Sequence, residues 1–426
     1  MGSTLLEFGH WLRSQDAGPA PSTGRPPVAV SPLSIEGCAI KQAGQLWKCR
    51  SVTAFRAPEL YARDEVGWVD DYYGACLDLG ANTVRWFAMW ANTDYSPITT
   101  QFANSYYDDL EAALLHAKAA GLYVHLTAFC DQVPGSTVWM MTPSAHHDEA
   151  AQAEHLIELI EMSKRTQNVL LEVSNEDWKN GNIAARFDRA AFEGTISTRS
   201  SWEETSPPSD PQVCGSWLQW STKHLERTPD WPRKGKVLYE IQYEGLGAYP
   251  PARIPAISGE PQRIGEGTTP RQHADNAACC EIMGAGGCLH GGFSSFDSSH
   301  DNDLQNCRMS GTPDAMAAAQ AVGAVWKSTV LDVRAGTTEK LVRGTEYDDG
   351  PCPVHHRDRY NTDSPHNEPQ TGANRTYFKF FDGDRLACGL AVDPAPQWPG
   401  YQLRADNGWH IVDQGGYEGN LLRLSR

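Results

Sequence analysis

The sequence has few long apolar runs, and its first residues do not show the pattern of a secretory signal peptide. No stretch of about 18 uncharged apolar residues occurs, so the sequence excludes a transmembrane helix. The N-terminus also lacks the basic start and the continuous apolar core of a secretory signal peptide. The sequence therefore gives no indication of Sec export.

Positive charge is scarce relative to negative charge. Lys and Arg number 36 against 53 Asp and Glu, which gives a formal net charge of −17. Such a chain repels phosphate groups, so we expect neither nucleic acid nor an anionic membrane as its main partner. Aromatic residues are plentiful, with 14 Trp, 15 Tyr and 12 Phe. Aromatic residues commonly fill cores, but Trp-rich clefts also bind sugar rings.

Several short motifs are missing. No C-x-x-C occurs among the 11 Cys, and at 426 residues a disulfide-stapled scaffold is not expected. Cys279 and Cys280 are interpreted as small buried apolar residues. No G-x-G-x-x-G follows a predicted strand, which argues against a dinucleotide-binding sheet. No Walker loop and no G-x-S-x-G are found, which argues against an NTPase and a serine esterase.

What is present is an alternation of short apolar strands with amphipathic helices. The sequence predicts strands at 47–55, 81–90, 122–129, 168–176, 253–261 and 287–296, and helices at 105–121, 148–166, 270–286 and 313–330. Residues 216–224 are read as a further strand and 236–245 as a helix, with a strand as the alternative. The fifth strand is hard to place between 183 and 203. Short connections in this order favour parallel strands with helices outside them.

These units predict an α/β protein with a TIM (β/α)8 barrel over residues 34–330, and an open doubly wound sheet is the alternative. Residues 1–33 are expected to form a flexible N-terminal arm, since 14–33 are rich in Pro, Gly and Ser. From 331 to 426 long helices vanish and short strands alternate with Gly, Asp and Pro turns. This pattern predicts a small C-terminal antiparallel β-domain of the sandwich type, with strands at 375–381, 385–392 and 409–414.

Two carboxylates end predicted strands of the barrel. Glu176 ends LLEVSNE directly after Asn175, and Glu260 ends IPAISGE. Barrel enzymes place their chemistry at the C-terminal ends of strands, so these two residues can face each other across a substrate. A retaining glycosidase needs such a pair about 5–5.5 Å apart, and an inverting one about 6.5–9.5 Å apart. A solvated strand end or a salt bridge is the structural alternative for each residue alone.

The segments LEVSNE and IPAISGEP resemble the clan A retaining glycoside hydrolases, (β/α)8 enzymes that include the family five cellulases and mannanases. The resemblance spans about residues 45–330. It implies that Glu176 is the acid/base, Asn175 binds the sugar 2-hydroxyl, and Glu260 is the nucleophile. Arg85 in NTVRWF matches the clan's second-strand Arg, which would lie beside Glu260 and keep that carboxylate charged.

Other positions depart from the pattern of that clan. His125 lies early in its strand, where the clan has a His at the strand end. The sixth strand offers His224, and the eighth ends in His290 and Phe293 in place of a Trp. We take these three as candidate substrate contacts, together with Trp90 and Trp178 near the predicted barrel mouth.

No metal and no cofactor are expected. The segment 297–306 contains Asp residues without EF-hand spacing, and 146–149 and 352–356 contain His without a completing ligand set. A polar loop is therefore the preferred interpretation of each segment.

The sequence thus predicts a retaining O-glycoside hydrolase acting on a carbohydrate substrate by double displacement. The rival is a non-catalytic carbohydrate-binding or virion structural protein on a glycosidase-like barrel. The Pro-rich arm favours this rival, as does the likeness of the layout to phage-encoded chains. Without a signal peptide or a transmembrane segment, a cytoplasmic or virion-associated location is favoured over Sec secretion.

Overall fold

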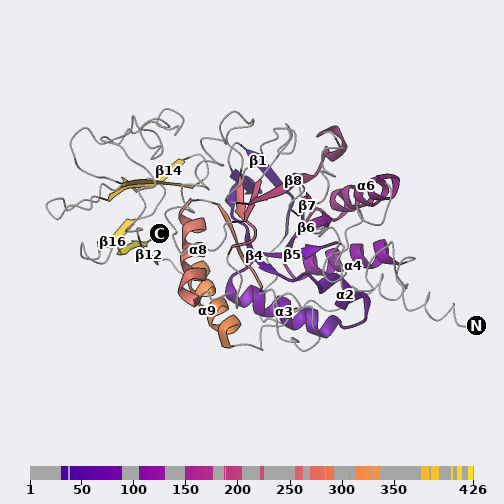
Figure 1. Ribbon diagram of the computed structural model, residues 1–426, viewed down its shortest axis with the longest axis horizontal. Coiled ribbons are helices and arrows are strands. Elements are labelled where there is room, and N and C mark those ends of the chain that lie inside the picture. Colours follow the sequence, from indigo (N-terminus) through magenta and orange to yellow (C-terminus); the bar gives the residue numbers. More distant parts are fainter. Residues whose placement is uncertain are drawn as a thin grey trace, which may run out of the picture.

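Eight parallel strands form a closed barrel in the computed structural model, with helices outside it (Figure 1). The structure describes residues 30–36, 39–88, 105–129, 149–175, 187, 189–203, 221–224, 255–261, 269–283, 285–291, 307, 313–327, 330–334, 376–382, 385–392, 404–405, 410–414 and 421–425. Each strand pairs in parallel with the next one along the chain, and the last pairs with the first through Cys288 and Ser51. The predicted α/β barrel of the TIM type is therefore the observed arrangement.

The barrel strands follow the chain in order and are mostly short. They are β4 (Arg50–Thr53), β5 (Thr83–Phe87), β6 (Tyr123–Phe129), β7 (Val169–Ser174), β8 (Ile196–Glu203), β9 (Ser221–His224), β10 (Ala256–Ser258) and β11 (Gly286–Leu289). The fifth strand, β8, falls within the window left open by the sequence. Its sequence ISTRSSWE has no apolar run, and its buried Ser197 and Thr198 explain why hydrophobic periodicity did not show it. Segment 236–245 lies outside the described residues.

The helices cover the outer faces of the strands. They are α2 (Ala57–Ala62), α3 (Val66–Leu79), α4 (Tyr106–Ala119), α6 (Glu149–Thr166), α8 (Pro270–Met283) and α9 (Pro313–Lys327). Helices α2 and α3 were not predicted from the sequence. Helix α3 ends at Gly80, whose φ of 90° is a left-handed conformation that glycine adopts without strain. Outward-facing strand residues such as Trp86, Leu126 and Val173 join helix residues such as Leu159 in the main core.

A small antiparallel sheet closes the N-terminal end of the barrel. Its strands are β1 (Leu33–Glu36), β2 (Ala39–Gln42) and β3 (Gln45–Trp47), which the sequence analysis did not predict. They pack against the first residues of several barrel strands. We call the buried residues of this contact the basal layer: Ile40, Trp47, Cys49, Tyr123, Leu170 and Ile257. The Tyr123 hydroxyl also donates a hydrogen bond to the Ser31 carbonyl at 2.5 Å.

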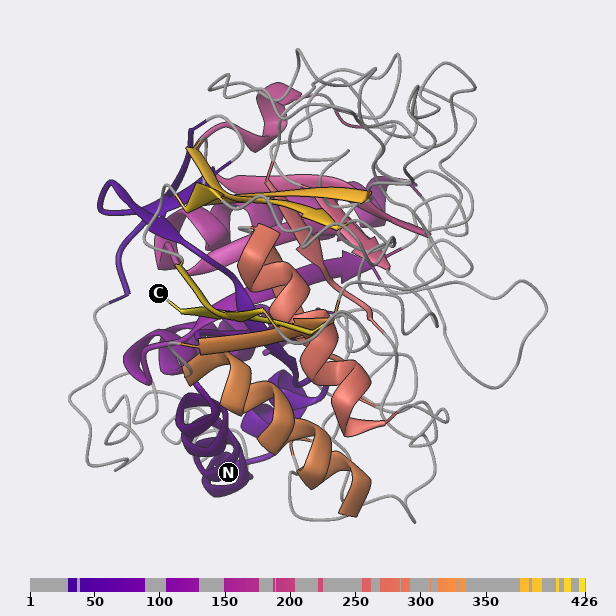
Figure 2. The same ribbon diagram turned by 90° about the vertical axis from the view of Figure 1, so that its left-hand side faces the viewer.

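The C-terminal strands form two antiparallel sheets of three strands each, beside α8 (Figure 2). One contains β12 (Val330–Arg334), β17 (Leu421–Ser425) and β16 (His410–Gln414). The other contains β13 (Thr376–Asp382), β14 (Arg385–Val392) and β15 (Arg404–Ala405). The assignment of residues 331–426 to a separate sandwich domain, like the other domain boundaries, stays a prediction. In the described part of the chain, no helix combines the length and the apolar composition needed to span a bilayer.

Candidate active site

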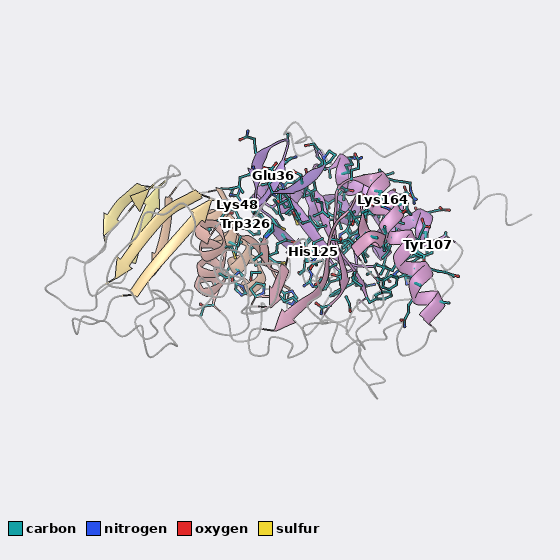
Figure 3. The ribbon with its side chains drawn as sticks, turned by 90° about the horizontal axis from the view of Figure 1, so that it is seen from above. Glu36, Lys48, Tyr107, His125, Lys164 and Trp326 are labelled. Atoms are coloured by element: carbon teal, nitrogen blue, oxygen red, sulfur yellow. The ribbon has the colours of Figure 1, made fainter. Side chains whose placement is uncertain are left out.

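Alternate residues of neighbouring barrel strands carry polar side chains into the interior. Arg85 on β5 is in register with His125 on β6, and Thr127 on β6 is in register with Glu172 on β7. Residues in register point to the same face of a parallel sheet, and successive residues alternate between faces. All four side chains are fully buried. Figure 3 shows His125 among the strands, whereas the labelled Tyr107 and Lys164 lie on helices outside them.

Arg85 connects three strands at this level. Its Nη1 lies 2.6 Å from Glu260 Oε1 and 3.4 Å from the carbonyl oxygen of Gly259. Its Nη2 donates to Asn175 Oδ1 at 3.0 Å and to Glu172 Oε2 at 3.2 Å. The Arg85–Glu260 contact is the one that the sequence predicts. The planar guanidinium suits this arrangement because its donors lie in a fixed fork.

Glu172 is the least expected member of the group. Its Oε2 accepts a hydrogen bond from Thr127 Oγ1 at 2.7 Å and lies 3.1 Å from His125 Nε2. Burial alone would favour the neutral acid, but the bond with His125 and the charge of Arg85 outweigh it and lower the pKa of Glu172. Burial also lowers the pKa of His125, so its ring is neutral at pH 7 and donates through Nε2.

Arg85 remains charged in this buried place. Burial opposes its charge, but the carboxylates of Glu260 and Glu172 more than offset that effect and raise its pKa. With His125 neutral, one guanidinium faces two carboxylates. The group of Arg85, His125, Thr127, Glu172 and Glu260, which we call the polar cluster, therefore carries one negative charge in excess.

Aromatic rings cover one side of Arg85. The Phe55 and Phe87 rings stack with centroids 4.3 Å apart, and the guanidinium carbon of Arg85 lies 5.8 Å and 5.3 Å from their centroids. His290 packs against Phe55 with ring centroids 5.9 Å apart. These rings exclude water from Arg85 and add a favourable interaction between the cation and the ring faces.

The structure brings together Arg85, Asn175 and Glu260, and it places His290 at the aromatic wall beside them. His224 is the last residue of β9, and the position of its side chain is not described. The predicted site residues that lie outside the described part of the chain are Glu176, Trp90, Trp178 and Phe293.

The sequence did not predict the roles of Glu172, Thr127, Phe55 and Phe87 in this arrangement. One signal was available, because Glu172 is a carboxylate in the middle of the apolar run VLLEVS. A charged residue in a fully buried strand requires a buried partner. Of the predicted buried cysteines, Cys280 is 1% exposed, and the side chain of Cys279 is not described.

Within the described residues, no group of three or more His, Cys, Asp or Glu side chains is placed to hold a metal ion. The side chains of 146–149, 297–306 and 352–356 lie outside that part of the chain.

Comparison with known proteins identifies the fold. No protein-family model matches the sequence, and no curated protein sequence matches it. A solved glycoside hydrolase family 5 protein from Bacteroides vulgatus aligns with a TM-score of 0.52 and 13% identity, over 94% of this chain and 94% of that chain. A second solved structure, of a glycoside hydrolase, aligns with a TM-score of 0.50 and 13% identity, over 94% of this chain and 98% of that chain. At this identity the likeness shows a shared fold.

Proposed function

We propose that this chain is a retaining O-glycoside hydrolase with its site at the C-terminal mouth of the barrel. The observation that carries the proposal is the buried Arg85–Glu260 pair, formed where β5 and β10 approach the mouth and joined there by Asn175. Polar groups at the C-terminal ends of barrel strands are where enzymes of this fold place their chemistry. The fold shared with glycoside hydrolases supports the same proposal.

Glu260 is the proposed nucleophile. An attacking carboxylate must be ionised, and the guanidinium 2.6 Å away favours the ionised form. The side chain is 10% exposed while that of Arg85 is fully buried, so Glu260 lies at the edge of the polar cluster. A group that must be charged and still reach a substrate requires this combination.

Glu176 is the proposed acid/base, and it follows Asn175 directly in the chain. Asn175 Oδ1 accepts from Arg85, which turns the amide nitrogen away from the guanidinium. That nitrogen is the proposed donor to the sugar 2-hydroxyl. One residue pair thus supplies a substrate contact and a proton donor at the same strand end.

The reaction proceeds in two displacements. Glu260 attacks the anomeric carbon while Glu176 transfers its proton to the glycosidic oxygen, so the leaving group departs as an alcohol. Glu176, now a carboxylate, then removes a proton from water. That water breaks the bond between the sugar and Glu260, which restores both carboxyl groups. The substrate is a carbohydrate, and the proposed further contacts come from His224, His290, Trp90, Trp178 and Phe293.

The C-terminal β-region, 331–426, is proposed to be an accessory domain that contributes no catalytic group. No metal or cofactor is part of the proposed reaction, because two carboxyl groups suffice for it.

The deciding experiment compares two substitutions on a panel of aryl glycosides and polysaccharides. Glu260→Ala removes the nucleophile and should abolish turnover of every substrate. Glu176→Ala removes only proton transfer, worth roughly 10²–10⁴-fold, and a dinitrophenyl glycoside needs little protonation. That substrate should still form the intermediate, and azide should restore turnover.

Three outcomes would contradict this assignment. Equal behaviour of the two variants in an active enzyme would show that the roles are wrong. Inversion at the anomeric carbon would exclude the covalent intermediate. Sugar binding without hydrolysis by the unmodified protein would support the rival, a carbohydrate-binding or structural protein on the same barrel.

A further inference from the structure

Glu172 is a fully buried carboxylate that the proposed reaction does not use. It lies on β7, inside the barrel, and its Oε2 faces donors from β5 and β6. Its side chain points into the barrel, as do its neighbours in register, Thr127 and Thr198. A buried charge requires partners, and one of the partners of Glu172 is Arg85, which also contacts Glu260.

We propose that Glu172 is a positioning residue that fixes the guanidinium of Arg85 and shares its charge with Glu260, so that Glu172 sets the pH at which Glu260 ionises. Only the effect of Glu172 on catalysis rests on the proposed function. The contacts of Arg85 with Glu172 and Glu260, and their effect on the ionisation of Glu260, do not depend on it.

The positions of the Arg85 nitrogens support the first part of the proposal, that Glu172 fixes the guanidinium. Nη1 of Arg85 is directed at Glu260, and Nη2 is divided between Asn175 and Glu172. Because the guanidinium is planar, fixing Nη2 also fixes the direction of Nη1. Glu172 is itself held by Thr127 and His125, so the orientation is transmitted from β6 through β7 to β5.

The charges around Arg85 support the second part of the proposal, that Glu172 shares the positive charge of Arg85 with Glu260. Among the described residues, the titratable groups that face Arg85 are Glu172 from β7, Glu260 just after β10, His125 from β6 and Cys288 from β11. His125 is neutral, and burial raises the pKa of the Cys288 thiol to about 12, so neither adds charge at pH 7. The single positive charge therefore faces two carboxylates. The negative charge of Glu172 opposes the ionisation of Glu260 even while its hydrogen bonds hold Arg85 in place.

These two effects have opposite signs, and two substitutions separate them. Glu172→Gln keeps an oxygen that accepts from Arg85 and Thr127 but removes the negative charge. The pKa of Glu260 should then fall by about one unit, because Arg85 is no longer shared. Glu172→Leu removes the acceptor as well, so Arg85 loses its fixed direction and the pKa of Glu260 should rise.

Thr127→Val is the matched control. It removes one hydrogen bond to Glu172 at nearly constant side-chain volume and leaves every charge in place. If any disturbance of the cluster alters the ionisation of Glu260, this variant should alter it too. We expect the pKa of Glu260 to stay within about 0.3 units of its value in the unmodified protein, roughly a third of the change expected for the Gln variant.

The measurement is a pH titration of the full chain labelled with ¹³C at the glutamate carboxyl carbon, followed by NMR. The Glu260 signal is identified by its absence in Glu260→Gln. The proposal is supported if the pKa of Glu260 falls in Glu172→Gln and does not change in Thr127→Val. It is overturned if the pKa of Glu260 rises or does not change in Glu172→Gln, whether or not Glu172→Leu folds.

Turnover gives a second readout if the proposed function holds. The acidic limb of kcat/KM should move to lower pH in Glu172→Gln by the amount seen in the NMR titration. Glu172→Leu should lower kcat/KM by about 100-fold, the loss typical of a misplaced catalytic group. If no substrate is turned over by any form, the proposed function fails, and the NMR titration still decides the role of Glu172.

Discussion

The two ends of the barrel interior differ sharply within the length of a single strand. On β7, Leu170 belongs to the apolar basal layer, and Glu172, the next inward-facing residue, belongs to the polar cluster. On β6 the same step leads from Tyr123 to His125. The chemistry of the interior therefore changes completely over two residues, or roughly 7 Å along a strand.

This difference shows how the barrel divides its tasks. The basal layer is covered by the N-terminal sheet and consists of side chains that carry no charge. The polar cluster lies above it, toward the mouth, where the positive charge of Arg85 faces the carboxylates of Glu172 and Glu260. Stability should depend on packing at the base and on charge balance above it, and activity only on the second.

The largest expected effect comes from Arg85→Ala. This substitution leaves Glu172 and Glu260 buried without their cation, and removing one partner of a buried pair costs about 3–5 kcal/mol. Without the cation, burial raises the pKa of both carboxyl groups above their ordinary values of about 4, so the folded variant binds protons as the pH falls toward 4. The difference in unfolding free energy from the unmodified protein should shrink over that range. Urea unfolding at pH 7 and at lower pH measures it.

Arg165→Ala is the matched control for this prediction. Arg165 pairs with Glu111 and Glu158 on the surface, and its side chain is 47% exposed. Exposed pairs of this kind contribute about 0–1 kcal/mol. If Arg85→Ala costs no more than Arg165→Ala, the polar cluster does not support the fold, and the comparison between the two ends loses its basis.

Leu170→Ala tests the base directly. Leu170 is fully buried in the basal layer, and truncating such a side chain costs about 2–5 kcal/mol. In the folded fraction, kcat/KM should remain within about twofold of its original value, since the polar cluster keeps its contacts. Leu115→Ala, at a Leu that is 46% exposed on α4, is the control and should cost under about 0.5 kcal/mol. If Leu170→Ala lowers kcat/KM without lowering stability, the basal layer supports activity and not stability, which is the reverse of what we expect.

The fold was more predictable than the interior of the barrel. Apolar runs such as LYVHLTAF and NVLLEVS predict strands because their outward faces meet helices, and β6 and β7 lie there. The sequence did not place strand β8 because ISTRSSWE has no apolar run and its buried residues include the polar Ser197 and Thr198. The sequence did not predict the strands β1, β2 and β3, because they are three or four residues long and their pairing depends on contact with the barrel.

The site was predictable only where a strand end made it visible. Asn175 and Glu260 follow the ends of β7 and β10, and Arg85 could be grouped with them because NTVRWF matches a known pattern. Glu172 and Thr127 could not, because their contact depends on the register between β6 and β7. Register follows from how whole strands pack, which local sequence does not specify.

A third prediction concerns the layer between the strands and the helices. There burial acts on His155, which has no charged partner among the described residues. Burial lowers the pKa of His155 to about 4, and its Nδ1 lies 3.0 Å from the Tyr107 hydroxyl. The unfolded chain binds a proton near pH 6.5, so it holds more protons than the folded one between about pH 6.5 and 4. Stability should therefore fall over that window, by up to about 3 kcal/mol from this group alone.

His155→Gln should remove this part of the acid sensitivity. The variant will be less stable at pH 7, because it loses packing against Phe129 and Tyr106. Its stability should nevertheless fall less between pH 7 and pH 4.5 than that of the unmodified protein, by about 2–3 kcal/mol. Denaturant midpoints at the two pH values measure this difference. An identical decline in both proteins would show that His155 does not titrate on unfolding, and that acid acts through the polar cluster instead.

The smallest expected effect comes from one added methyl group at the base. In Gly286→Ala the new Cβ would lie 2.7 Å from the Cβ of Cys49 and 2.8 Å from Cγ1 of Ile257. Both neighbours are buried in the basal layer, so neither can retreat into solvent, and overpacking of this kind costs about 1–3 kcal/mol. Gly67→Ala on α3 meets nothing within 4 Å and should instead stabilise the protein by up to about 1 kcal/mol. Thermal unfolding of both variants, with kcat/KM measured on the folded protein, separates packing at the base from function at the mouth. If Gly286→Ala shifts the pH dependence of kcat/KM, strain at the base reaches the polar cluster, and the two ends of the barrel are coupled.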